Sequence, residues 1–317
     1  MRLLPRCFYT HTLVALLGLL PVSSVAQSLL SLPGTQEFIT EMQTQHDFSK
    51  AELEHWFREG EYQPRIIELI SKPAEGKPWH AYRPIFVNAQ RIQGGVQFWR
   101  QHAAALQRAE NQFGVPASII IAIIGVETRY GGNTGGFRVF DALATLAFDY
   151  PKRAAFFRKE LENYLLMSRT ETMDPLRLKG SYAGAMGLPQ FMPSSYRAYA
   201  VDFDDDGRRN LFSDPTDAIG SVANYFVKHG WKAGEPVVIP AAVKGHAWED
   251  LLSKDLKPQH SLSTLKAAGV TALEPVPASS TAALLEYDAG EEPEYWLGLN
   301  NFYVITRYNR SPLYALA

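Results

Sequence analysis

Apolar side chains recur at helical spacing through most of the chain. From Thr35 to about Gly230, aliphatic and aromatic residues return every three or four positions, which is typical of amphipathic helices. The run Ile119–Val126 is apolar on every side and predicts a helix buried in the core. The pair Gly131–Gly132 follows this run and is expected to end the helix. This part of the chain therefore predicts a helical core.

The spacing of apolar residues along the chain changes after the helical part. From Glu235 to about Pro293 the chain is rich in proline, and runs such as Pro236–Pro240 predict short strands and turns. The tail, Asn300–Asn309, returns to dense aromatic and polar side chains that are suited to line a groove. We therefore predict a mainly α fold with a small β-containing insertion.

The first residues are typical of a secretory signal. Arg2 and Arg6 precede the apolar stretch Leu13–Leu20, and Ser24–Ala26 suits signal peptidase, with cleavage before Gln27. Residues 1–26 are therefore predicted to be the signal peptide of an exported protein.

The position of the single cysteine bears on whether the exported chain is anchored to a membrane or contains a disulfide. Cys7 lies ahead of the apolar stretch, where it cannot become the acylated cysteine at the mature N-terminus of a lipoprotein. No second long apolar span follows it. We expect a soluble mature chain with no stable membrane anchor and no disulfide, so that its stability depends on packing. The remaining residues, about 290, suffice for one large core with an insertion or for two small domains.

The charge balance and the absence of several motifs exclude some classes of function. The chain has 31 Lys and Arg against 33 Asp and Glu, so we expect no polycationic surface for nucleic acid or anionic lipid, and a neutral substrate fits better. Its eight histidines include no His-x-x-x-His pair, and its serines no Gly-x-Ser-x-Gly motif. We expect no catalytic zinc, no serine triad and no cofactor for catalysis.

Glu127 is the first candidate for chemistry. It follows the apolar run directly and falls in the last turn of the predicted helix, where the helix dipole disfavours a negative charge. Burial and the dipole both raise the pKa of a carboxyl, which lets it hold a proton near neutral pH and donate it. The alternative is an exposed carboxylate just past a core helix, and this segment by itself favours neither interpretation.

The stretch Gly180–Ser195 is the second candidate. Its small residues let a ligand or backbone approach closely, while Ser181 and Gln190 offer hydrogen bonds and its Met and Phe side chains supply apolar walls. The alternative is a Gly-rich turn after which Ser194 or Ser195 caps the next helix. Considered together with Glu127, the stretch favours one side of a cleft.

Three motifs carry a resemblance to a known family. They are Gly125–Gly131, Gly184–Ser194 and Tyr303–Asn309. Together they resemble the membrane-bound lytic transglycosylase B family, glycoside hydrolase family 103, which cuts bacterial peptidoglycan. The resemblance runs from about Thr35 to the C-terminus and implies a lysozyme-like helical core in a periplasmic protein.

The resemblance implies roles for individual residues. The catalytic acid and base falls on Glu127, the serine that hydrogen-bonds to it on Ser181, and the glutamine beside the reacting sugar on Gln190. The substrate-binding residues of the groove fall on Tyr82, Lys152, Arg153, Tyr225, Tyr308, Asn309 and Tyr314. Lys152 replaces an arginine of the family, which keeps the charge and loses the planar fork.

The resemblance also implies a mechanism with one carboxyl group. Most glycosidases use two, but a sugar with a 2-acetamido group supplies its own nucleophile, and N-acetylmuramic acid is such a sugar. Glu127 would protonate the glycosidic oxygen and then take the proton of the sugar's 6-hydroxyl, which closes a 1,6-anhydro ring. The alternatives are a muramidase that delivers water to C1 and a non-catalytic peptidoglycan-binding protein.

The segment Asp202–Arg208 resembles the start of a calcium-binding loop. Asp202, Asp204 and Asp206 occupy the first, third and fifth places and Gly207 the sixth, as in an EF-hand. The twelfth place, which needs a bidentate glutamate, is Ser213, so the usual loop is incomplete.

The family resemblance offers a longer loop. Asp217 would close it, with Asp214 as a second candidate, and Arg208 would contribute its backbone carbonyl. We expect a structural Ca²⁺ there, although sodium also suits such ligands. The alternative is an Asp-rich turn in which Asp214 caps a helix from Pro215 to His229.

These predictions divide the chain into five parts. They are a signal peptide at 1–26, an N-terminal helical region at 27–113, a lysozyme-like catalytic core with the EF-hand-like loop at 114–232, a small β-containing insertion at 233–294, and a C-terminal groove segment at 295–317 that returns to the core.

Overall fold

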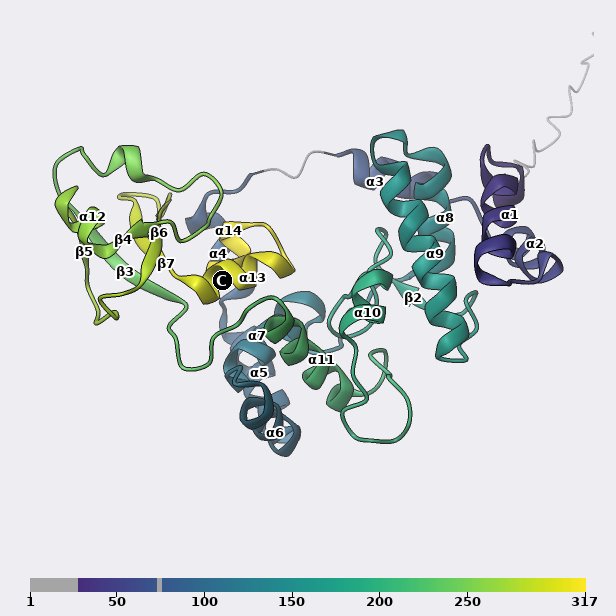
Figure 1. Cartoon of the computed structure of the whole chain (residues 1–317), viewed down its shortest axis with the longest axis horizontal. Coiled ribbons are helices and arrows are strands. Elements are labelled where there is room, and N and C mark those ends of the chain that lie inside the picture. The colour runs from purple at the N-terminus through teal and green to yellow at the C-terminus, as the bar shows by residue number, and fades with distance from the viewer. Residues whose placement is uncertain (1–27, 73–75) are drawn as a thin grey trace, which may run out of the picture.

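The computed structural model describes residues 28–72 and 76–317 (Figure 1). The predicted signal peptide at residues 1–26 lies outside them. Within the described part, no single helix has both the length and the apolar character needed to cross a membrane, although the bent pair Ala103–Phe113 and Ala117–Thr128 together meet those criteria.

Helices make up most of the described chain before residue 230. The first half contains η1 (Leu29–Ser31), α1 (Thr35–His46), α2 (Lys50–Glu59), α3 (Pro64–Ser71), α4 (Trp79–Phe86), α5 (Ala89–Gln101) and α6 (Ala103–Phe113). Next come α7 (Ala117–Thr128), α8 (Val139–Asp149), η2 (Pro151–Arg153), α9 (Ala154–Thr170), α10 (Pro193–Tyr199) and α11 (Pro215–Lys228). A short antiparallel pair, β1 (Phe137–Arg138) and β2 (Lys179–Gly180), lies among them.

A five-stranded antiparallel sheet follows the helical part. Its elements are β3 (Val238–Val243), η3 (Glu249–Leu251), β4 (His260–Ser261), α12 (Leu262–Ala267), β5 (Val270–Ala272), β6 (Thr281–Tyr287) and β7 (Glu294–Gly298). The strand order is β4-β6-β7-β3-β5. The chain then ends in α13 (Asn300–Tyr308) and α14 (Pro312–Leu316). The predicted mainly α fold with a small β-containing part is confirmed.

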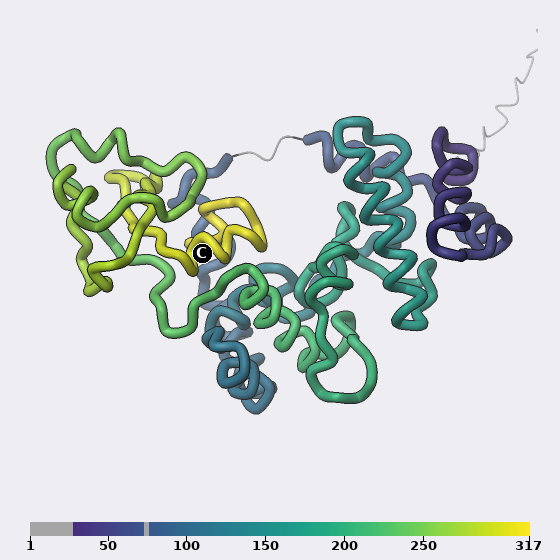
Figure 2. The backbone as a smooth tube through the Cα atoms, viewed as in Figure 1, coloured from purple at the N-terminus to yellow at the C-terminus, as the bar shows by residue number. Residues whose placement is uncertain are grey.

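The helical pairs and the sheet occupy opposite sides of the molecule. Helices α8 and α9, with α1 and α2 outside them, form one side in Figure 1, while the sheet and α12 form the other. Helices α5, α6, α7 and α11 connect the two sides. The last segment, yellow in Figure 2, returns from the sheet so that α14 packs against α4.

Both faces of the sheet are covered. On one face Ile239, Leu284 and Leu297 form a small core with residues of α12 and the loops. On the other, Leu285 and Trp296 pack with residues of α4 and α13. This second face joins the sheet to the helical part.

Strand β7 crosses the boundary that we predicted at residue 294. Its register with β3 pairs Trp296 with Pro240 and Leu297 with Ile239, so it belongs to the sheet through Gly298. The sequence pattern missed it because Tyr295, Trp296 and Leu297 form a short apolar run without the alternation of polar and apolar residues that marks a strand.

Candidate active site

Glu127 lies in the last turn of α7, as predicted. Most apolar residues of this helix are buried, although Ala122 is exposed. Arg129 and Tyr130 adopt left-handed conformations, with φ of 53° and 60°, that end the helix. The helix therefore stops two residues before the glycine pair that we expected to end it. Glu127 sits where the buried helix meets the surface, and its side chain is only partly accessible to water.

The Glu127 carboxyl has one tyrosine as a close partner. Tyr314 of α14 donates a hydrogen bond from its hydroxyl to Oε1 of Glu127 at 2.7 Å. Burial raises the pKa of Glu127 to about 7, although the hydrogen bond from Tyr314 lowers it in part. At neutral pH the group is therefore divided between the acid and the carboxylate, which suits both giving and taking a proton.

Three tyrosines from distant parts of the chain surround this carboxyl. Tyr82 lies on α4, Tyr308 at the end of α13 and Tyr314 on α14. Burial raises the pKa of each hydroxyl, and the charge of Glu127 raises it further. All three hydroxyls therefore stay protonated and can act as hydrogen-bond donors.

The Gly-rich stretch is tied to the end of α7 by a residue that we did not predict. Thr128 is fully buried, and its hydroxyl donates to the backbone carbonyl of Leu188 at 2.9 Å. The hydroxyl of Tyr308 donates to the carbonyl of Pro189. The sequence shows a threonine directly after the candidate acid, but nothing near it in the sequence indicates that its hydroxyl would bond to Leu188.

Gln190 is held in a defined orientation in the same stretch. Its Nε2 donates to the carbonyls of Thr134 at 3.1 Å and Gly187 at 2.9 Å. Its backbone has a φ of 50°, which is uncommon for a residue with a side chain. These contacts fix the side chain beside the loop that follows α7.

The small residues of this stretch are needed by the backbone. Gly187 has a φ of +69°, and a Cβ there would lie 2.4 Å from the carbonyl oxygen of Leu211. Gly184 has a φ of +85°, and a Cβ there would lie 2.4 Å from Leu143. Glycine is required at both positions by conformation and by close packing.

The alternative interpretation, in which Ser194 or Ser195 caps the next helix, is wrong. Helix α10 begins at Pro193 and has no side-chain cap, so both serines lie within its first turn. The carboxylate of Glu160 accepts from the backbone N–H of Ser194 at 2.9 Å and from its hydroxyl at 2.6 Å. An acidic side chain from α9 thus takes the place of the cap.

The hydrogen bond that the resemblance implies between Ser181 and Glu127 is not formed in the described part of the chain. The Oγ of Ser181 instead accepts from the backbone N–H groups of Ala183 at 3.3 Å and Ala185 at 3.0 Å. A serine that closes a turn in this way uses its hydroxyl oxygen locally. In this structure Ser181 shapes the turn from Ser181 to Ala185.

Two of the other predicted groove residues use their polar atoms within the protein. Tyr225 is buried, and its hydroxyl donates to the carbonyl of Arg307 at 2.6 Å. Asn309 is exposed, and its Oδ1 accepts from the N–H of Ser311 at 3.0 Å. The ring centres of Tyr225 and Tyr308 lie 4.8 Å apart. Tyr225 therefore packs against Tyr308, and its hydroxyl hydrogen is already used within the protein.

Lys152 and Arg153 lie together on the turn between α8 and α9. Both are exposed, and the guanidinium of Arg153 stands over the ring of Phe156 at 4.1 Å. They belong to the side of the molecule opposite the sheet in Figure 1.

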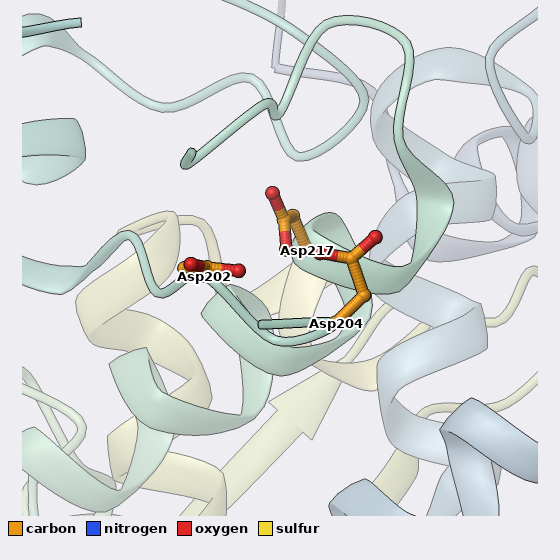
Figure 3. Close-up of side chains that lie close together, drawn as sticks. All are labelled: Asp202, Asp204 and Asp217. Carbon is orange, nitrogen blue, oxygen red and sulfur yellow. The ribbon is translucent and has the colours of Figure 1, made fainter. Parts of the chain in front are cut away.

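The Asp-rich loop brings three carboxylates together (Figure 3). Asp202, Asp204 and Asp217 each place a carboxylate oxygen within 4.8 Å of the others. Asp217 is buried, and its two oxygens accept from the N–H groups of Phe203 at 2.6 Å and Asn210 at 2.7 Å. Burial raises the pKa of Asp217 despite these hydrogen bonds, a cost that a bound cation would offset.

The other predicted ligands of this loop form local hydrogen bonds. Oδ1 of Asp206 accepts from the N–H of Arg208 at 2.8 Å. Asp214 caps α11, because its Oδ1 accepts from the N–H of Thr216 at 2.7 Å. The cap that we weighed as an alternative is therefore formed, while Asp217 faces the other aspartates.

These features define a class of protein. A helical fold in which a partly buried glutamate with a raised pKa lies among tyrosine hydroxyls is the arrangement of a lysozyme-like enzyme that acts by general acid catalysis. Residues 32–317 match the family model described as the transglycosylase SLT domain.

Known proteins identify the family more closely. The chain is 47% identical over 295 residues to membrane-bound lytic murein transglycosylase B of Escherichia coli, a match that covers 90% of this chain and 80% of that protein. The structure is similar to soluble lytic transglycosylase SltB1 of Pseudomonas aeruginosa, with 53% identity, a TM-score of 0.86 and coverage of 90% of this chain and 95% of that one. It is also similar to Escherichia coli Slt35 in complex with calcium, with 46% identity, a TM-score of 0.85 and 92% of each chain covered. The chain belongs to the membrane-bound lytic murein transglycosylase B family, and the predicted family and lysozyme-like fold are confirmed.

Proposed function

We propose that this protein is a lytic transglycosylase that cleaves the β-1,4 bond between N-acetylmuramic acid and N-acetylglucosamine in peptidoglycan and leaves a 1,6-anhydro end. Its membership of the family supports the enzyme class and the action on peptidoglycan. The observation that carries the chemistry is the Glu127 carboxyl, which is partly buried, accepts a hydrogen bond from Tyr314 and has a pKa raised to about 7.

In the first step protonated Glu127 donates its proton to the glycosidic oxygen, and the bond from that oxygen to C1 of N-acetylmuramic acid breaks. Positive charge develops at C1. The carbonyl oxygen of the sugar's own 2-acetamido group stabilises it, which is the role a second carboxylate has in most glycosidases. Among the described residues, no other carboxyl contributes to the raised pKa of Glu127, in keeping with an acid that acts without such a partner.

In the second step Glu127 acts as a base. Its carboxylate takes the proton of the 6-hydroxyl, the O6 atom bonds to C1, and the anhydro ring closes without water being consumed. The hydrogen bond from Tyr314 stabilises the carboxylate between the two steps and keeps it oriented. Acid and base are thus the same group in successive protonation states.

We assign the substrate-binding roles by position. We place Tyr82, Tyr308 and Tyr314 nearest the reacting sugar, because they share the surroundings of Glu127. The hydroxyls of Tyr308 and Tyr314 donate to Pro189 and Glu127, so these two would contact the sugar through their rings and hydroxyl oxygens. The other members of the proposed groove are Ser181, Gln190, Lys152, Arg153, Tyr225 and Asn309. The exposed Lys152, Arg153 and Asn309 would contact more distant parts of a glycan strand. Ser181 and Tyr225 would act indirectly, Ser181 by shaping its loop and Tyr225 by packing against Tyr308.

We also propose a structural Ca²⁺ in the Asp-rich loop. Asp202, Asp204 and Asp217 would hold it, with Asp206 and the backbone carbonyl of Arg208 completing the oxygen ligands. The calcium complex of Slt35 supports this assignment for a relative. The ion would pin the loop to the start of α11 and take no part in the reaction.

We place the mature protein in the periplasm, as a soluble enzyme released by cleavage near Ala26 whose partner is the glycan strand. The export-type N-terminal sequence and the position of Cys7 support this placement. We retain the proposed domain division, with the sheet extended to Gly298.

Product analysis tests the reaction. Purified protein is incubated with peptidoglycan with and without a calcium chelator, and the fragments are examined by mass spectrometry. The proposal requires anhydro ends, which lack one water relative to reducing ends. Reducing ends would establish a hydrolytic muramidase instead. Equal and negligible release by the native protein and by Glu127→Gln, with binding retained, would establish a peptidoglycan-binding protein.

A further inference from the structure

Tyr130 has a backbone conformation that the turn after α7 would form more easily with glycine. It follows Arg129 in the left-handed region, with a φ of 60°. Glycine adopts this region at little steric cost, whereas a tyrosine there must be held by contacts that its side chain makes elsewhere. Those contacts lie where α7 packs against α5.

Three glycines leave a space for the Tyr130 ring, and we call this space the glycine slot. A Cβ at Gly94 would lie 2.8 Å from a ring carbon, while Cβ atoms at Gly95 and Gly125 would lie 2.8 Å and 2.6 Å from the hydroxyl oxygen. Gly94 and Gly95 belong to α5 and Gly125 to α7, although glycine inside a helix weakens it. The ring of Tyr130 thus fills the room that three absent side chains leave between the two helices.

Hydrogen bonds in both directions tie the slot together. The hydroxyl of Tyr130 donates to the carbonyl of Arg91 on α5 at 2.8 Å. The guanidinium of Arg91 donates to the carbonyl of Gly125 on α7. The ring of Tyr130 also packs against Phe98 of α5, with ring centres 5.7 Å apart. Tyr130 and Arg91 therefore join the end of α7 to α5.

The turn that Tyr130 holds is the turn that carries Glu127. The N–H groups of Arg129 and Tyr130 donate to carbonyls of the preceding turn at 3.0 Å and 3.3 Å, the pair of bonds that ends a helix in a Schellman motif. Glu127 lies between the donors and the acceptors of these bonds, so its backbone is placed by them. Its partner Tyr314 comes from α14, and the contact of 2.7 Å between the two side chains requires that each be held in place.

We propose that Tyr130 is a positioning residue for the reaction: its ring in the glycine slot fixes the last turn of α7 and so holds the Glu127 carboxyl against Tyr314. Tyr130 does not act on the sugar, because its hydroxyl already donates to Arg91. The proposal rests on the function proposed for Glu127 and adds to it the part of the protein that keeps the acid in place. Tyr130→Gly separates the two roles of the residue, since glycine suits the turn but leaves the slot empty.

The surroundings of Glu127 determine how its pKa responds to such a change. Burial is the main cause of the raised pKa, and no charged side chain among the described residues contributes to it. Tyr82, Tyr308 and Tyr314 face the carboxyl from α4, α13 and α14, and the pKa of each is raised, so none titrates near neutral pH. If the turn is loosened, water reaches the carboxyl and its pKa falls toward 4.5.

The kinetics of Tyr130→Gly on peptidoglycan test the proposal. We expect kcat to fall about tenfold with KM little changed, because the tyrosines around the carboxyl come from other elements. The alkaline limb of the pH profile of kcat/KM should move to lower pH, which partial unfolding of the sample would not cause. Asp47→Gly is the matched control, since Asp47 is an exposed left-handed residue, with a φ of 56°, that ends α1. Native kcat in Tyr130→Gly, or a lower kcat with an unmoved limb, overturns the proposal.

Two further variants test the ring and its slot. Tyr130→Phe keeps the ring and should retain at least about a third of the native kcat; a loss as large as that of Tyr130→Gly overturns the role of the ring. Gly95→Ala places a methyl group where the hydroxyl of Tyr130 lies and should lower kcat about tenfold. In Tyr130→Gly, where the slot is empty, Gly95→Ala should change kcat less than about twofold. Equal factors in the two backgrounds overturn the proposal.

A measurement of stability separates this proposal from the reaction. Urea unfolding is followed at pH 4 and pH 8 for the native protein, Glu127→Gln, Tyr130→Gly and the double variant. The pH-dependent effect of Glu127→Gln on stability reports the burial of the carboxyl without any catalysis. Tyr130→Gly should reduce this effect at least twofold and Asp47→Gly should not, even if product analysis refutes the transglycosylase reaction. An undiminished effect in Tyr130→Gly overturns the proposal.

Discussion

Replacing Glu127 by glutamine tests the physical state of the carboxyl as well as its role. The glutamine side chain would occupy nearly the same volume and would keep an oxygen that accepts the hydrogen bond from Tyr314. It would lose the proton that the reaction transfers. We expect the release of fragments to fall by at least about a hundredfold, since a positioned general acid contributes a factor of that order.

The same substitution should stabilise the protein, but only at high pH. The pKa of Glu127 is raised from 4.5 to about 7 on folding, so between these values the folded state binds more protons than the unfolded state. The stability of the native protein therefore decreases as pH rises through this window. The pKa difference of about 2.5 pH units lowers the free energy of unfolding of the native protein by about 3 kcal/mol above pH 7 and leaves it unchanged below pH 4.5. Glutamine has no such cost.

Urea unfolding at pH 4 and pH 8 measures this difference. The free energy of unfolding of Glu127→Gln, relative to that of the native protein, should be about 3 kcal/mol higher at pH 8 than at pH 4. Glu52→Gln, an exposed glutamate on α2, is the matched control and should show no such dependence. An equal effect of Glu127→Gln at both pH values would refute the argument that burial raises the pKa of this carboxyl.

Three further substitutions test the surroundings. Tyr314→Phe removes the hydrogen bond that lowers the pKa of Glu127, so the alkaline limb of the pH profile of kcat/KM should move to higher pH while the rate falls; an unmoved limb would contradict this role. Asp217→Asn should abolish the rise in Tm on adding calcium, measured against chelator by scanning fluorimetry, whereas Asp205→Asn in the same loop should retain it; equal responses would count against the site. Gly187→Ala should lower the free energy of unfolding by about 2 kcal/mol or more in urea, because its φ is +69° and a Cβ meets backbone; a change below about 0.5 kcal/mol would show that the loop adapts.

The sequence determined the features that depend on neighbours along the chain. Periodicity predicts helices, an apolar run predicts a buried one, and its boundary places Glu127 in a last turn where burial raises its pKa. The spacing of Asp202 and Asp204 likewise predicts two members of the carboxylate cluster. Each of these follows from local geometry, which a single segment contains.

The tertiary structure decided which distant groups meet. Tyr314 is 187 positions from the carboxyl that it contacts, and Thr128 reaches a carbonyl 60 positions away. No local pattern specifies such contacts, since they depend on how helices pack and on where α14 returns to the core. For the same reason packing buried Tyr225 among helices and turned Ser181 toward its own loop. Residue types and spacing thus determined the candidate acid, while long-range packing determined the donors that surround it.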